Sequence, residues 1–126
     1  MIKNISSSEI KKFIEENSNV ELLDVRTAQE WDNVGKPNGE KLGIKTHFIT
    51  LERNPDGNIS DKFFEQVKEN IQQDKEILII CQAGGRSMLA SQLLSNKNYK
   101  CINVSDGFEG NGVDPGWLSA GLPSVD

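Results

Sequence analysis

The chain has 126 residues, a formal net charge of −5 and 36% hydrophobic residues. This length predicts one domain, residues 1–126, that buries its core without disulfides or metals. The acidic balance excludes a general nucleic-acid-binding role. No segment has the length and apolarity of a membrane span, and the first residues lack the apolar run of a signal peptide, so we expect a cytoplasmic protein with no membrane partner.

The first quarter of the chain predicts a helix, a strand and a second helix. Ser6 and Glu9 have the spacing of a capping box, and apolar residues on one helical face follow them. Residues 20–25 are mostly apolar and predict a buried strand. Thr27 and Glu30 form a second capping box, which predicts another short helix.

The middle of the chain predicts a loop, a strand, a turn and a long helix. Residues 35–39 contain Gly and Pro and predict a loop, and residues 44–49 predict a short strand. Residues 54–57 read Asn-Pro-Asp-Gly, which is typical of a turn. Ser60 or Asp61 caps the next helix. The apolar face of this helix comprises Phe63, Phe64, Val67 and Ile71.

The last part of the chain adds two strands and one helix. Residues 76–80 are an apolar run and predict a buried strand, and residues 99–104 predict another. Between them, a helix is expected from Ser87. Because strands alternate with helices throughout, the sequence predicts a small α/β domain with a mainly parallel sheet and helices on both faces. In such sheets, ligands bind beyond the carboxyl ends of the strands.

A cysteine stands at the carboxyl end of the predicted strand 76–80. The segment that follows reads Cys81, Gln82, Ala83, Gly84, Gly85, Arg86 and Ser87. Backbone N–H groups of such a Gly-rich turn, together with the start of a helix, favour the thiolate over the thiol. The helix dipole disfavours a cation at a helix start, so Arg86 predicts an anion or a carboxylate as its partner.

Three segments of the sequence resemble the rhodanese-like domain family. Residues 23–31 (LDVRTAQEW) are similar to the family's Asp-Val-Arg segment followed by Glu-Trp or Glu-Phe. The cysteine loop closed by Arg86 is the second segment. The third is the C-terminal part, with Gly107-Phe108-Glu109-Gly110, Trp117 and Gly121-Leu122-Pro123. One departure is residues 35–43 (GKPNGEKLG), where the family often has Gly-His-Ile-Pro-Gly-Ala.

This resemblance implies a rhodanese-like fold and a sulfurtransferase. Cys81 would take sulfane sulfur from a donor, form a persulfide and pass the outer sulfur to an acceptor. The donor would be a small anion such as thiosulfate, or a persulfide, and the acceptor a thiol, cyanide or a protein. The resemblance places donor binding at the amides from Gln82 to Ser87 and a fixed positive charge at Arg86. No metal or organic cofactor is required. Because Gln82 and Ala83 are neutral, we expect thiosulfate to be a poor donor.

Other functions for the same cysteine remain open at this point. Phosphatases and arsenate reductases also use a loop cysteine and a closing arginine, but with five residues between them, whereas four separate Cys81 from Arg86. As an enzyme of this kind, the chain would bind a tetrahedral oxyanion. A non-catalytic rhodanese-like module is a second alternative. The third is a redox sensor in which Cys81 pairs with Cys101.

Four further residues have chemistry of their own but fit structural roles better. Asp24 and Arg26 predict an ion pair at a strand end. His47, the single histidine, is expected to belong to the scaffold or surface rather than to activate the thiol. Cys101 lies in a predicted strand and is expected in the core. Packing roles are likewise expected for Trp31, Phe48 and Trp117.

Overall fold

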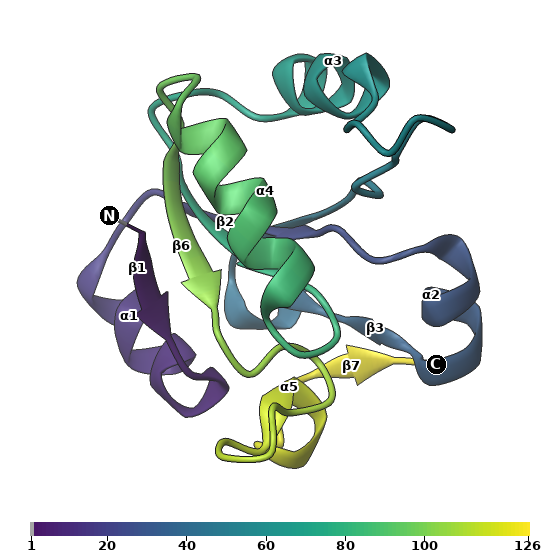
Figure 1. Ribbon diagram of the computed structural model, residues 1–126. Coiled ribbons are helices and arrows are strands. Elements are labelled where there is room, and N and C mark those ends of the chain that lie inside the picture. Colours follow the sequence, from purple (N-terminus) through teal and green to yellow (C-terminus); the bar gives the residue numbers. More distant parts are fainter. Residues whose placement is uncertain (1) are drawn as a thin grey trace.

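The computed structural model describes residues 2–126 and has a five-stranded, fully parallel sheet at its centre (Figure 1). The strand order is β1-β6-β5-β2-β4. The strands are β1 (Lys3–Ile5), β2 (Val20–Asp24), β4 (Lys45–Phe48), β5 (Glu76–Ile80) and β6 (Lys100–Val104). Strand β5 therefore lies in the middle, with β2 and β6 beside it. The predicted fold class, an α/β protein with a parallel sheet, is confirmed.

Helices cover both faces of this sheet. They are α1 (Ile10–Glu16), α2 (Ala28–Val34), α3 (Asp61–Asn70), α4 (Gly85–Ser95) and α5 (Gly116–Ser119). Successive strand residues point to opposite faces, so Leu78 joins the core beneath α1 and α5, whereas Ile77 and Ile79 join the core beneath α3 and α4. The β5 residues that enter the two cores are all apolar, which explains the continuous hydrophobic run in the sequence of this strand.

The helix starts predicted at Ser6, Thr27 and Ser60 are present. The Ser6 N–H donates to Glu9 Oε1 at 2.9 Å, although the first turn, Ser7–Glu9, is a 3₁₀ turn ahead of α1. Thr27 and Glu30 form the reciprocal capping box of α2. The Ser60 hydroxyl caps α3 by accepting the Lys62 N–H at 3.2 Å. Each cap satisfies a backbone donor that the first helical turn leaves without a partner.

Several details differ from the sequence-based expectations, which included neither β1 nor α5. Residues 35–39 are not all loop, because β3 (Lys36–Pro37) pairs antiparallel with β7 (Ser124–Val125). A second 3₁₀ turn, Gly39–Leu42, follows β3. Helix α4 begins at Gly85 rather than at Ser87, since Gly84 adopts the left-handed conformation that starts it. Within residues 2–126, no helix combines the length and the apolar character that crossing a bilayer requires.

Candidate active site

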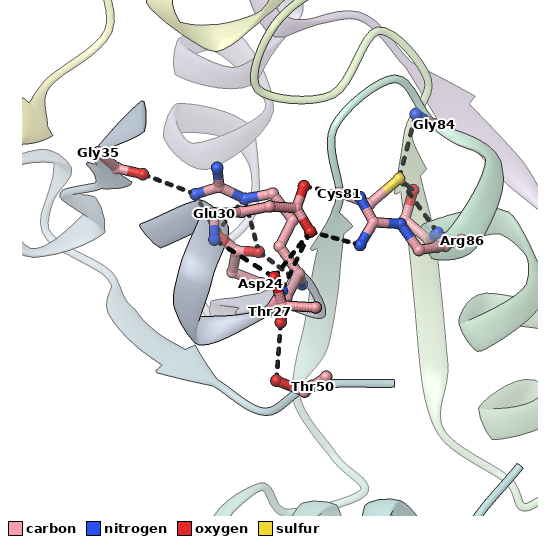
Figure 2. A network of polar contacts seen from close by, with 10 residues as sticks. Asp24, Thr27, Glu30, Gly35, Thr50, Cys81, Gly84 and Arg86 are labelled. Carbon is pink, nitrogen blue, oxygen red and sulfur yellow. Dashed lines mark hydrogen bonds and ion pairs between the residues drawn. The ribbon is translucent and has the colours of Figure 1, made fainter. Parts of the chain in front are cut away.

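Cys81 lies directly after β5, at the carboxyl edge of the sheet, and two backbone amides point at its sulfur (Figure 2). The N–H of Gly84 donates to Sγ with an N–S distance of 3.2 Å, and the N–H of Ser87 does so at 3.3 Å. Cys81 is 1% exposed, whereas Gln82 and Ala83 on the loop beside it are exposed. Two backbone donors are thus directed at one buried sulfur.

The rest of the loop offers further amides with no partner of their own. In a regular helix, Gly85 and Arg86 would donate to the carbonyls of Cys81 and Gln82. Those carbonyls are already occupied, because Phe108 N–H donates to Cys81 O at 2.8 Å and Glu109 N–H donates to Gln82 O at 3.0 Å. No acceptor among residues 2–126 bonds the Gly85 and Arg86 amides. The loop thus keeps donors free for an anion at a helix N-terminus.

Glycine is required where this loop meets the turn after β6. Gly84 has a φ of +101°, and a Cβ on it would overlap the backbone carbonyl of Ser105. Gly107 has a φ of +63°, and a Cβ there would overlap the backbone of Gln82. Two backbones can approach this closely only without side chains between them. The turn after β6 therefore fixes the shape of the cysteine loop.

A buried polar chain continues from the sulfur into the sheet. The Ser87 hydroxyl lies 3.2 Å from Cys81 Sγ and donates to Asn103 Oδ1 at 2.6 Å. The Asn103 amide nitrogen faces the Gly84 carbonyl at 3.3 Å and donates to Asn4 Oδ1 at 2.9 Å, which fixes the orientation of the side chain. The single Ser87 proton is thereby directed away from the sulfur. Asn103 has no local signal in the sequence, because its partners lie on other elements.

Arg86 makes a bidentate ion pair with Glu30 of α2. Its Nη1 lies 2.6 Å from Glu30 Oε1 and its Nη2 lies 2.8 Å from Oε2. Chiefly because of these hydrogen bonds, the pKa of Glu30 falls to about 2 and the pKa of Arg86 is raised. The Arg86 side chain is 36% exposed. Of the two partners expected for Arg86, an anion or a carboxylate, the structure shows the carboxylate.

Asp24 and Arg26 form the expected ion pair, and it is fully buried beside the site. The Arg26 Nη2 lies 2.9 Å from Asp24 Oδ2 and also donates to the Gly35 carbonyl at 2.9 Å (Figure 2). The Arg26 guanidinium lies 4.3 Å from the centre of the Phe108 ring. These contacts connect β2, the end of α2 and the turn after β6. The pair is therefore part of the scaffold that holds the cysteine loop.

His47 and Cys101 lie away from the sulfur of Cys81. His47 Nε2 lies 2.6 Å from Glu21 Oε1, and Lys75, which precedes β5, lies 3.9 Å from the same carboxylate. Glu21 and Lys75 lie toward the amino ends of β2 and β5, whereas Cys81 follows the carboxyl end of β5. Cys101 is half-buried, and burial raises its pKa to about 12. It therefore stays protonated at neutral pH.

The described residues also include a cavity that lies away from the cysteine loop. A cavity of about 640 Å³ lies between α3 and the end of α4, lined by Ile71, Leu94 and Tyr99 among others, and Cys81 does not line it. No group of three or more His, Cys, Asp or Glu side chains in residues 2–126 is placed to hold a metal ion.

Comparison with known proteins identifies the fold of this loop and sheet. The family model for the rhodanese-like domain matches residues 6–111. The chain belongs to the rhodanese-like domain family. It is 39% identical over 124 residues to an uncharacterized protein of Rickettsia prowazekii (strain Madrid E), covering 98% of this chain and 97% of the relative. A second relative, the Bacillus subtilis (strain 168) "Putative sulfurtransferase YtwF", is 29% identical over 106 residues, and the match covers 84% of this chain and 86% of that relative.

A solved structure extends the rhodanese-like match to the whole chain. The crystal structure of Rv0390 from M. tuberculosis superposes with a TM-score of 0.78 at 27% identity, covering 97% of this chain and 96% of that one. The rhodanese-like resemblance read from the sequence is thus confirmed. One relative in this comparison has the name "Putative sulfurtransferase".

Proposed function

We propose that this rhodanese-like protein is a sulfurtransferase that carries sulfane sulfur on Cys81. The observation that carries the proposal is the pair of amides, Gly84 N–H and Ser87 N–H, that donate to the sulfur while the Gly85 and Arg86 amides stay free. The first pair supports the thiolate that attacks the donor. The free pair would hold the outer sulfur of the persulfide, which is also an anion.

The proposed reaction has two balanced steps. In the first, the Cys81 thiolate attacks the sulfane sulfur of the donor, a new S–S bond forms, and the donor's own bond to that sulfur breaks. The leaving group departs with the bonding electron pair, as sulfite from thiosulfate or as a thiolate from a persulfide. In the second step, a thiol, cyanide or a protein acceptor attacks the outer sulfur, and the Cys81 thiolate is released.

Persulfidation of one defined peptide tests this function. The protein is incubated with thiosulfate or with a small persulfide, and the peptide that contains Cys81 is analysed by mass spectrometry. We expect a gain of one sulfur atom, which cyanide then removes as thiocyanate. Cys81→Ser should abolish both the mass gain and the thiocyanate. Cys101→Ser should change neither, since that thiol is protonated. The proposal fails if Cys81 gains no sulfur from either donor.

The three alternatives make different demands on the same loop. A redox sensor needs Cys81 and Cys101 to meet, yet Cys101 lies opposite Ile77 in the sheet, four positions from Cys81. That spacing is about 13 Å along the strand, and a disulfide requires Cα atoms within about 7 Å. Phosphoryl transfer uses a longer loop than the four residues here. A non-catalytic module would leave Cys81 unmodified by the donors.

A further inference from the structure

Arg86, the one charged residue of the cysteine loop, is already paired with Glu30 in this structure. We propose that Glu30, through its ion pair with Arg86, makes the site select sulfane donors with one negative charge over the dianion thiosulfate. The inference rests on the proposed sulfurtransferase function and names the donor class for it. Glu30 would be a specificity residue that acts through Arg86, not a residue that touches the sulfur.

Glu30 is fixed on two sides, so it does not leave Arg86 easily. Its Oε1 accepts the backbone N–H and the hydroxyl of Thr27, both at 3.2 Å, in the capping box of α2. The same carboxylate accepts hydrogen bonds from both terminal nitrogens of the Arg86 guanidinium, Nη1 at 2.6 Å and Nη2 at 2.8 Å. Its side chain is 21% exposed, and its pKa of about 2 keeps it ionised at neutral pH. The compensating negative charge is thus permanent under ordinary conditions.

No second cation in the loop replaces the charge that Glu30 neutralises. Arg86 is the one charged residue between positions 81 and 87. The neighbouring Arg26 is paired with Asp24, and both side chains are fully buried. What remains to attract an anion is the set of partial charges on the free loop amides. Dipoles of this kind suit a single negative charge better than two, and the whole chain adds a net charge of −5.

The two donor classes differ in the charge that the site must accept. Attack of the thiolate on thiosulfate brings three negative charges together and releases sulfite with two of them. Attack on methanethiosulfonate, which has the same sulfane sulfur but one charge, brings two together and releases methanesulfinate with one. Both reactions leave the same Cys81 persulfide. Any difference between them therefore reports the charge selectivity of the site rather than the chemistry of the sulfur.

The test compares kcat/KM for methanethiosulfonate and thiosulfate, with cyanide as the acceptor, at low ionic strength. Glu30→Gln removes the charge and keeps a side chain that can complete the capping box. We expect the preference for methanethiosulfonate to fall by about ten-fold in this variant, because Arg86 then faces the dianion uncompensated. Added salt should reduce the change. The matched control, Glu16→Gln, removes one charge from the exposed end of α1 and should leave the ratio unaltered.

Arg86 supplies an independent arm of the test. In Arg86→Gln, the Glu30 carboxylate is unpaired, and the preference for methanethiosulfonate should rise several-fold. In the double variant, both charges are gone and the ratio should return to within about two-fold of the wild-type value. An unchanged ratio in Glu30→Gln, with Cys81 still taking up sulfur, overturns this inference alone. Absence of sulfur uptake by wild-type Cys81 from both donors overturns the proposed function and, with it, the inference.

Discussion

The ion pair between Glu30 and Arg86 should make the stability of the fold depend on pH in the acid range. In the folded protein the pKa of Glu30 is about 2, against 4.5 for an unperturbed glutamate. Because the folded value is the lower one, the stabilisation is complete above pH 4.5. It is lost as the pH falls from about 4.5 to about 2. The perturbation that isolates it is Glu30→Gln, which removes the charge and retains the cap.

The size of this effect follows from the shift and from the exposure of the pair. A shift from 4.5 to about 2 corresponds to about 3 kcal/mol if the pair were shielded from water. The Arg86 side chain is 36% exposed, so solvent screening reduces the expected value to about 1–2 kcal/mol. Glu30→Ala should cost about 1 kcal/mol more, because it also removes the two hydrogen bonds that the Glu30 carboxylate accepts from the backbone N–H and the hydroxyl of Thr27.

Urea unfolding of both variants at pH 7 and near pH 2 measures these quantities. At pH 7 we expect Glu30→Gln to be less stable than the wild type by the amount above, and near pH 2 the two should nearly coincide. Glu16→Gln should follow the wild type at both values. A Glu30→Gln deficit of the same size at pH 7 and near pH 2 would refute the reasoning, because it would show that the charge of Glu30 does not contribute.

Three further predictions concern the loop, the second thiol and the core. Gly107→Ala should distort the cysteine loop, since its Cβ meets the backbone of Gln82, and sulfur uptake should fall well below wild type while circular dichroism stays native. Iodoacetamide at pH 8 should label Cys81 in the folded protein but not Cys101, whose pKa of about 12 keeps it protonated; equal labelling would contradict this. Trp117→Phe should lower the free energy of unfolding by about 1–3 kcal/mol. The reason is that Trp117 is fully buried and its indole N–H donates to the Pro123 carbonyl at 2.7 Å. Urea unfolding with no shift in midpoint would exclude this contribution.

Local signals in the sequence were enough to predict four of the five strands of the sheet and the starts of α2 and α3. The continuous apolar run of β5 and the capping box of Thr27 and Glu30 each lie within a few residues, and the structure has both. The pairing of Lys36–Pro37 with Ser124–Val125 was missed, because a two-residue strand has no periodicity to read. The segment was therefore interpreted as loop.

The site shows the same division between local and distant contacts. The cysteine, its glycines and the following helix are contiguous, so their arrangement could be predicted. The partner of Arg86 is 56 residues away, and the sequence indicated Glu30 only as a cap. Asn103 was not singled out at all, since its contact with Ser87 depends on β6 lying beside β5. Roles that need tertiary contact are visible only once the strand order is known.

The dependence of the cysteine loop on the turn after β6 has a consequence for synthesis on the ribosome. The donors that occupy the carbonyls of Cys81 and Gln82 are Phe108 and Glu109, which emerge long after the thiol itself. Strand β1 likewise waits for β6, its neighbour in the sheet. A nascent polypeptide that ends before residue 107 therefore has the nucleophile but not the backbone arrangement around it. Reactivity at Cys81 should arise late in translation, when the final quarter of the polypeptide is free to fold.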